Sequence, residues 1–234
     1  MIFNLIAIAL ISYILGSIPF SLVFVKLFTK KNLHELGSKN AGALNTLRIV
    51  AKEKGKVWGV LSFLLVGILD ASKGVFAVLI AKSYFFPILL QTSAEITMPW
   101  PTIVAIIAFF AVLGHNYSIF LKFKGGRGAA TLFGILLYLN VTAALGILGF
   151  VLLFIFLGEL LAGHKLNKKF VSAAISNQII GRLLGEIVGL FWMYTIDPMV
   201  FYIAALPIVL IVFAHKDRLD EQIKKIKDKT YLKD

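Results

Sequence analysis

The sequence contains no cysteine and few charged residues. Of its 234 residues only 15% are charged, whereas a soluble domain carries about 25%. The lack of cysteine excludes disulfide bonds and thiolate metal sites. Hydrophobic residues make up 59% of the chain, and its mean hydropathy is +0.89. This composition excludes a soluble globular protein and predicts an all-α integral membrane protein.

Acidic residues are also scarce. The chain has 12 Asp and Glu against 24 Lys and Arg, which gives a formal net charge of +12. In a polar protein this excess would indicate nucleic acid, but in a hydrophobic one it is typical of loops on the cytoplasmic side of a membrane. We therefore expect the lipid bilayer, and no nucleic acid, as a partner. Because the sequence shows no internal repeat, we expect residues 1–234 to form a single polytopic membrane domain.

The apolar stretches predict a seven-helix transmembrane bundle. Ile2 to Val25 carry no charge and can cross about 30 Å of hydrocarbon, and they lack the pattern of a cleaved signal peptide. No charge occurs between Arg127 and Glu159, yet the basic segments that flank this stretch should lie on the same side of the membrane. The chain must therefore cross twice here, with a turn near Asn140. The remaining spans are expected at 57–81, 101–121, 171–194 and 199–214.

This topology places the N-terminus outside and the C-terminus in the cytoplasm. The segments expected in the cytoplasm are 28–56, 122–128, 163–171 and 215–234, which are rich in Lys and Arg. The limb from Gly128 to Leu139 would be only roughly 18 Å long at about 1.5 Å per residue. We expect one short helix there, directly after a glycine-rich segment and buried against other helices.

The glycine-rich segment combines Lys124 and Arg127 with Gly125, Gly126 and Gly128. Glycines let backbone N–H groups approach an oxyanion, the following helix N-terminus favours negative charge, and the two cations attract it. The segment therefore indicates a phosphate-binding cradle. The alternative is an ordinary basic turn at the edge of the membrane.

The first cytoplasmic loop has a similar character, because Ser38, Asn40, Asn45 and Arg48 alternate with glycines. Arginine can bind a phosphate through two hydrogen bonds, while Ser and Asn can bind further oxygens or a hydroxyl. A flexible turn is the alternative. Three polar residues at helix ends fall on the same predicted face: His115, Ser172 and His215. Their coincidence with both glycine-rich clusters indicates one phosphate-binding site at the cytoplasmic interface.

Charged residues inside predicted spans leave other functions open. Asp70 and Lys73 are three residues apart and suit an internal ion pair that places a helix. Arg182 and Glu186, four apart, can also pair. Intramembrane charges of this kind favour the main alternative function, a transporter or carrier for an anionic substrate. A third hypothesis is a protein that only binds anionic lipid, which the lysine-rich tail would suit.

Three stretches of the sequence resemble the motifs of a known family. Residues 37–48 (GSKNAGALNTLR) resemble G-S-G-N-x-G-A-T-N-x-x-R, and residues 70–74 (DASKG) resemble D-x-x-K-G. Residues 114–131 resemble G-H-x-[FY]-P-x-F followed by F-K-G-G-K-G-x-A-T. The family comprises the bacterial acyl-phosphate:glycerol-3-phosphate acyltransferases of the PlsY type. The resemblance extends from about residue 15 to residue 220.

The resemblance implies an enzyme that moves a fatty acyl group from acyl-phosphate to the 1-hydroxyl of glycerol 3-phosphate, giving lysophosphatidic acid and phosphate. It implies a site on the cytoplasmic side of the bacterial inner membrane, without a metal or cofactor, and we expect a monomer to suffice. Because the donor is already an activated anhydride, the enzyme mainly positions two phosphates and offsets their repulsion. The implied catalytic residues are Ser38, Arg48, Lys124 and His215. The implied substrate- and phosphate-binding residues are Asn40, Asn45, Lys73, His115, Gly125, Gly126, Arg127, Gly128, Ser172 and Arg218.

Several residues of the chain depart from the family pattern. Arg127 stands where the family has a second Lys in the glycine loop, and it keeps the charge with a different hydrogen-bond geometry. Arg218 stands where the family has Asn and adds a cation. Leu44 replaces Thr, and Ser118 replaces Pro.

Overall fold

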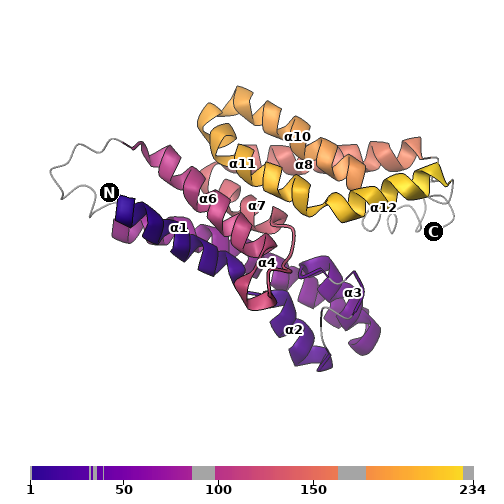
Figure 1. Cartoon of the computed structure of the whole chain (residues 1–234). Coiled ribbons are helices and arrows are strands. Elements are labelled where there is room, and N and C mark those ends of the chain that lie inside the picture. Colours follow the sequence, from indigo (N-terminus) through magenta and orange to yellow (C-terminus); the bar gives the residue numbers. More distant parts are fainter. Residues whose placement is uncertain are drawn as a thin grey trace. The chain divides into compact units, whose positions relative to one another are not determined.

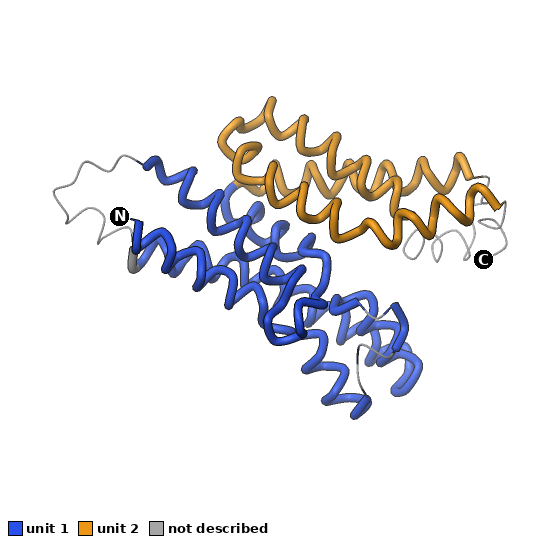
Figure 2. Tube along the Cα trace, viewed as in Figure 1, with its two compact units in different colours: residues 1–139 blue, residues 140–234 orange. Residues whose placement is uncertain are grey.

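The computed structural model describes residues 2–31, 33, 36–38, 40–85, 98–162 and 178–228. Every regular element within these ranges is helical (Figure 1), which agrees with the predicted all-α class. The chain divides into two compact units, residues 1–139 and residues 140–234 (Figure 2).

The first unit consists of long apolar helices joined by short turns. Its elements are α1 (Ile2–Ser17), α2 (Phe20–Thr29), α3 (Ala43–Lys54), α4 (Lys56–Ile80), the π-helical turn η2 (Ala81–Phe85), α6 (Trp100–Asn116), the 3₁₀ turn η3 (Ile119–Leu121) and α7 (Ala129–Leu139). Pro19 separates α1 from α2, since a proline lacks the N–H that a continuous helix would need there.

Small residues let the helices of the first unit approach closely. α1 packs on α6, and α4 packs on α7 (Figure 1). A Cβ atom at Gly16 would lie 2.1 Å from the carbonyl oxygen of Ala111, and one at Gly134 would lie 2.2 Å from that of Ala71. Such contacts between backbones are typical of helix packing in membranes. They hold α6 against α1 and α7 against α4, and the glycine-rich segment runs between α6 and α7.

The second unit contains α8 (Val141–Leu161), α10 (Ile179–Ile196), α11 (Pro198–Ala214) and α12 (Lys216–Lys227). The most extensive helix packing in the second unit joins α8 to α10. Gly181, Gly185 and Gly189 recur every fourth residue along α10 and lie against the backbone or side chains of α8. This stripe of small residues explains how two bulky apolar helices pack so closely.

Five of the described segments are long and apolar enough to cross a bilayer: Ile2–Thr29, Lys56–Ser83, Trp100–Leu121, Val141–Leu161 and Ile179–Ile196. α11 and α12 provide a sixth if the pair, bent by 55°, counts as one span. α7 has 11 residues and is too short to count, as expected for the limb after the glycine-rich segment. The chain is therefore a multi-pass membrane protein, and the count of seven helices and their orientation stay predictions.

Two of the turns that the predicted topology places outside, near Asn140 and near Asp197, lie together in the second unit. Asn140 caps α8, because its Oδ1 accepts from the N–H of Ala143 at 3.0 Å. Its Nδ2 donates to Oδ2 of Asp197 at 3.2 Å, and Oδ1 of Asp197 accepts from the N–H of Met199 at 3.0 Å. The start of α8 and the start of α11 therefore lie at one end of the unit, as the predicted pair of crossings requires.

Candidate active site

The glycine loop, residues 124–128, is held against the end of α6. The N–H of Gly125 donates to the carbonyl oxygen of Asn116 at 3.1 Å, and that of Gly126 donates to the carbonyl oxygen of His115 at 2.8 Å. Gly128 has φ +77°, a left-handed conformation that glycine adopts without strain, and α7 begins directly after it. The N–H groups in the first turn of a helix have no acceptor within the helix. The loop and the start of α7 thus have the geometry of an anion-binding turn.

The described residues of the other motif, 37–38 and 40–48, fold around the side chain of Asn45. Its Oδ1 accepts from the N–H of Ser38 at 2.9 Å, and its Nδ2 donates to the carbonyl oxygens of Leu36 at 3.3 Å and Asn40 at 3.1 Å. Asn45 is only 2% exposed. Gly37 has φ +59°, and a Cβ there would lie 2.2 Å from Oδ1 of Asn45. The side chain of Asn45 therefore organises the loop that carries Ser38 and Asn40.

The two glycine-rich motifs touch each other in the structure. The N–H of Ala41 donates to the carbonyl oxygen of Gly125 at 3.3 Å. A Cβ atom at Gly126 would lie 2.5 Å from the carbonyl oxygen of Ala41. Residues that are more than 80 positions apart thus form one layer at the ends of α3, α6 and α7.

Three cations lie close in sequence to this contact. Arg48 is half-buried on α3, one turn after Asn45. Lys124 is exposed directly before Gly125, and Arg127 is half-buried directly after Gly126. The first unit therefore brings the two motifs that carry these predicted cations into contact.

A buried polar cluster lies behind the glycine loop. Nζ of Lys73 forms an ion pair with Oδ1 of Asp70 at 2.9 Å and donates to the carbonyl oxygen of Ile18 at 3.2 Å. Nδ1 of His115 lies 3.7 Å from the same carboxylate oxygen and 3.4 Å from the hydroxyl of Thr131. Asp70, Lys73 and His115 are each less than 10% exposed. Lys73 and His115, both predicted to contact substrate, thus have protein partners in this structure.

Ser118 has a specific partner. Its hydroxyl donates to the carbonyl oxygen of Ser17 at 2.6 Å, and the side chain is buried. Proline at this position, as in the family motif, could not make this bond. The substitution therefore adds a hydrogen bond that holds the turn before the glycine loop to the end of α1.

The remaining predicted site residues belong to the second unit or lie outside the described residues. His215, 1% exposed, follows α11, and its Nδ1 lies 2.8 Å from the carbonyl oxygen of Ile211. Arg218, in the first turn of α12, forms an ion pair with Glu221 at 3.1 Å. Ser172 lies outside the described residues, as do the whole predicted loop 163–171 and the end of the tail.

Sequence reasoning missed a buried amide network in the second unit. Gln222 of α12 accepts through Oε1 from the N–H groups of Ile179 and Ile180 at 2.7 and 2.9 Å, and its Nε2 donates to Oε1 of Gln178 at 2.9 Å. Nε2 of Gln178 in turn donates to Glu159 at 3.3 Å. Gln222 therefore caps α10 from a helix more than 40 residues away. Its position in an apolar stripe of the tail helix was the one signal in the sequence.

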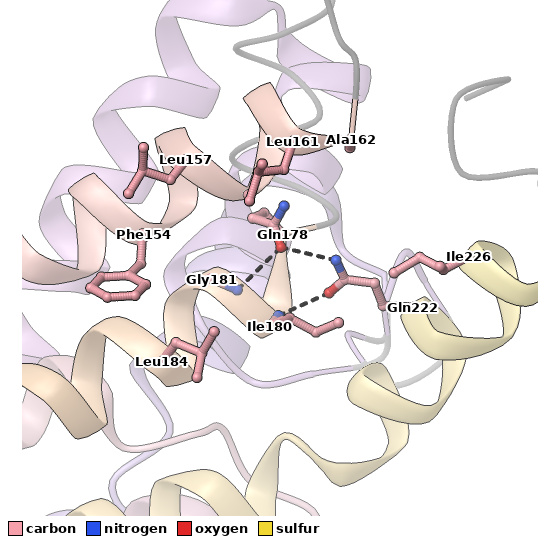
Figure 3. Close-up of a pocket in the computed structure, with 11 residues that line it drawn as sticks. Phe154, Leu157, Leu161, Ala162, Gln178, Ile180, Gly181, Leu184, Gln222 and Ile226 are labelled. Atoms are coloured by element: carbon pink, nitrogen blue, oxygen red, sulfur yellow. Dashed lines mark hydrogen bonds between the residues drawn. The ribbon is translucent and has the colours of Figure 1, made fainter.

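An apolar pocket of 660 Å³ adjoins this network (Figure 3). Apolar side chains of α8, α10 and α12 form most of its lining, and Gln178 and Gln222 are its polar members. The apolar members shown include Phe154, Leu157, Leu161, Leu184 and Ile226. This volume lies within the range of about 300–1,000 Å³ that is usual for small-molecule sites.

The fold and these loops define a class of protein: a multi-pass α-helical membrane protein with two glycine-rich polar loops in contact at its helix ends. The particular family follows from sequence. The family described as glycerol-3-phosphate acyltransferase matches residues 6–225, so the chain belongs to this family. The resemblance seen in the motifs is thereby confirmed, and the protein is a membrane glycerol-3-phosphate acyltransferase.

Individual relatives agree with this assignment. A glycerol-3-phosphate acyltransferase of Campylobacter lari is 40% identical over 127 residues, covering 54% of this chain and 56% of the relative. One of Staphylococcus aureus strain Newman is 37% identical over 157 residues (65% and 70%), and one of Staphylococcus haemolyticus is 36% identical over 187 residues (79% and 82%).

Solved structures agree as well. Crystal structures of PlsY (YgiH), an integral membrane glycerol 3-phosphate acyltransferase, in its glycerol 3-phosphate and lysophosphatidic acid forms are 25% identical to this chain, with TM-scores of 0.62 and 0.63. Each covers 97% of this chain and 93% of the solved chain.

These findings give no support to the alternative of a transporter. Its sequence basis, Arg182 and Glu186, lies one turn apart on α10. Glu186 is buried, and its Oε2 has no hydrogen-bond partner among the described residues. The structure shows no function for this carboxyl group.

Proposed function

We propose that this acyltransferase uses acyl-phosphate as its donor and esterifies the 1-hydroxyl of glycerol 3-phosphate. The hydroxyl oxygen forms a bond with the acyl carbon, the bond between that carbon and the phosphate oxygen breaks, and the hydroxyl proton leaves on the released phosphate. The products are lysophosphatidic acid and inorganic phosphate. The observation that carries the proposal is the contact between the two glycine-rich motifs, because the reaction requires two phosphate groups to be held side by side.

In this proposal the first unit binds the phosphates. The glycine loop and the start of α7 offer backbone N–H groups, with Lys124 and Arg127 beside them. Ser38, Asn40 and Arg48 reach the same helix ends from the other motif. Bringing two dianions together is unfavourable in a site of low dielectric, so these cations and N–H groups lower the barrier by positioning and by stabilising the departing phosphate.

Three predicted binding residues act indirectly in this proposal. Oδ1 and Nδ2 of Asn45 form hydrogen bonds with the backbone of the loop around Ser38, and Asn45 therefore shapes this loop. His115 supports the glycine loop from behind, since its carbonyl oxygen accepts from Gly126. Lys73 is paired with Asp70 and fixes α4 in the buried cluster.

The second unit contains an apolar pocket and three further predicted site residues. We assign the apolar pocket of Figure 3 to the acyl chain, because its lining is apolar and its volume suits a small molecule. Nδ1 of His215 donates to the carbonyl oxygen of Ile211, so that Nε2 of the neutral imidazole has acceptor character. Ser172, His215 and Arg218 are proposed as further substrate contacts.

The proposed location is the bacterial inner membrane, with the site on the cytoplasmic side, the N-terminus outside and the chain acting as one polytopic domain. The basic segments at 28–56, 122–128, 163–171 and 215–234 support this orientation. Both glycine-rich motifs come from one copy of the chain, which supports a functional monomer.

The experiment that tests the proposal measures phosphate release from palmitoyl-phosphate by purified protein in detergent, with and without glycerol 3-phosphate, together with lysophosphatidic acid formation. We expect release that depends on the acceptor and matches the product. Arg48→Ala and Lys124→Ala should each lower kcat/KM by at least about 100-fold. Lys52→Ala is the matched control, since it removes an exposed cation from the helix that carries Arg48. Full activity of Arg48→Ala or Lys124→Ala at limiting substrate would contradict the assignment.

A further inference from the structure

A basic pocket of 590 Å³ lies between the end of α2 and the turn that precedes the glycine loop. Its lining consists of Leu22, Lys26, Lys30, Lys31, Phe120, Leu121 and Lys122. Four of these seven residues are lysines and none is acidic. None of them has a role in the proposed acyl transfer, so the pocket needs an explanation of its own.

The two walls of the basic pocket are fastened to each other through α1. On one side, α2 continues the chain directly after α1. On the other side, the hydroxyl of Ser118 donates to the carbonyl oxygen of Ser17 at 2.6 Å. The hydroxyl of Tyr13 donates to the carbonyl oxygen of Tyr117 at 2.7 Å. These bonds hold Lys122 opposite the lysines of α2. The cluster is therefore a product of the packing rather than of sequence proximity.

Both walls carry a lysine in a left-handed conformation. Lys30, at the C-cap of α2, has φ 56°, and Lys122, after η3, has φ 51°. A residue with a Cβ atom adopts this conformation at an energetic cost, and glycine or asparagine would suit it better. Strained residues of this kind are concentrated at binding sites. Here two cations occupy such positions on opposite sides of one hollow.

The charges in the basic pocket are only partly offset. Lys31 forms an ion pair with Glu53, and the hydrogen bond from Lys31 lowers the pKa of the Glu53 carboxyl. Within the described residues, Lys26, Lys30 and Lys122 have no acidic partner. Like charges around a hollow produce a positive potential that an anion would relieve.

Exposed apolar side chains adjoin the lysines. Leu27 is 72% exposed, Phe120 57% and Phe123 61%. In a multi-pass membrane protein such side chains are covered by lipid, while lysines at the same level reach the headgroups. The occupant of the pocket should therefore have a negative headgroup and an apolar body, which a soluble anion does not.

We propose that the basic pocket binds the phosphate-bearing headgroup of an anionic membrane phospholipid. The headgroup lies among Lys26, Lys30 and Lys122, and the acyl chains run along Leu27 and Phe120. This is a lipid site separate from the acyl-transfer site. It does not depend on the identity of the acyl donor.

The test measures the thermal unfolding midpoint of the purified chain in detergent against the concentration of dioctanoyl phosphatidylglycerol. Dioctanoyl phosphatidylcholine and inorganic phosphate are tested separately. The variant Lys30→Gln/Lys122→Gln is compared with Lys52→Gln/Lys56→Gln, which removes the same charge from exposed positions outside the pocket. We expect phosphatidylglycerol to stabilise the wild type and this control, and to bind the pocket variant about 30-fold more weakly.

Two outcomes would overturn the proposal. The first is that the pocket variant and the control variant bind phosphatidylglycerol with equal affinity. The second is that inorganic phosphate stabilises the wild type as much as phosphatidylglycerol does. A second variant covers the case in which the double substitution prevents folding. Glu53→Gln leaves Lys31 without its carboxylate, which a glutamate carries at neutral pH. The affinity for phosphatidylglycerol should then rise. An unchanged or weaker affinity of Glu53→Gln would count against the site whatever the fate of the first variant.

Discussion

The backbone of Gly126 donates to the carbonyl oxygen of His115, and the imidazole of the same histidine occupies the space where a side chain at position 126 would lie. This arrangement seats the glycine loop directly on the end of α6. The carbonyl oxygen of Ala41, in the other motif, borders the same space. Two groups therefore restrict the room for a side chain at position 126. The shape of the proposed phosphate site therefore depends on the absence of a side chain here.

We predict that Gly126→Ala lowers kcat/KM about 100-fold, because its Cβ would lie 2.0 Å from Nε2 of His115 and force the loop to move. Gly67→Ala is the control, since a Cβ there meets nothing within 4 Å on α4. The measurement is steady-state acyl transfer with both substrates varied. Wild-type kinetics for Gly126→Ala would show that the loop does not hold substrate in the described form.

The buried ion pair between Asp70 and Lys73 predicts an asymmetric effect on stability. Asp70→Asn leaves the Lys73 ammonium buried without its counter-charge, and we expect a loss of about 3–5 kcal/mol. Removing both charges with Asp70→Asn/Lys73→Met should recover most of this loss. Thermal unfolding in detergent measures the difference. Equal midpoints for the wild type and Asp70→Asn would mean that the pair contributes little.

Asn45 and Gly37 should behave as one unit. Asn45→Ala removes the acceptor for the N–H of Ser38, and Gly37→Ala drives a Cβ into the same oxygen. Each change is expected to raise the KM for glycerol 3-phosphate by about tenfold or more, because the loop that carries Ser38 loses its shape. In the double variant the two effects should not add. Full additivity would indicate that Asn45 contacts the substrate independently.

The apolar pocket predicts a change in chain-length preference. Leu184→Trp would fill part of the pocket of Figure 3. Displacing two methylenes at about 0.8 kcal/mol each should lower kcat/KM for palmitoyl-phosphate by about tenfold and spare a dodecanoyl donor. Leu152→Trp, at an exposed position of α8 outside the pocket, is the control. An equal loss of kcat/KM with both donors would show that the acyl chain does not bind in this pocket.

Much of the fold was predictable from local patterns. The spans follow from long apolar runs, because hydrocarbon requires about 20 apolar residues per helix. The short helix over Ala129–Leu139 follows from the distribution of basic segments, since a single crossing would have put them on opposite sides. The glycine loop was recognisable because glycines and cations before an apolar helix form a compact local pattern.

The site was less predictable wherever a side chain's role depends on distant partners. Asn45 has the chemistry of a phosphate ligand, and only the folded loop reveals that both ends of its amide are already used. The position of Gln222 in the apolar stripe of the tail helix indicates burial, but only the structure shows that its side chain caps α10. The basic pocket likewise combines α2 with a turn about 90 residues away.

By itself, the sequence determined the membrane character, the helical class, the family and the two motifs with their charges, because each depends on composition or short-range spacing. Only the tertiary structure decided which polar groups form hydrogen bonds within the protein and which remain available to a ligand. The reason is that hydrogen bonds such as that from Ala41 to Gly125 join residues whose meeting depends on how all the intervening helices pack.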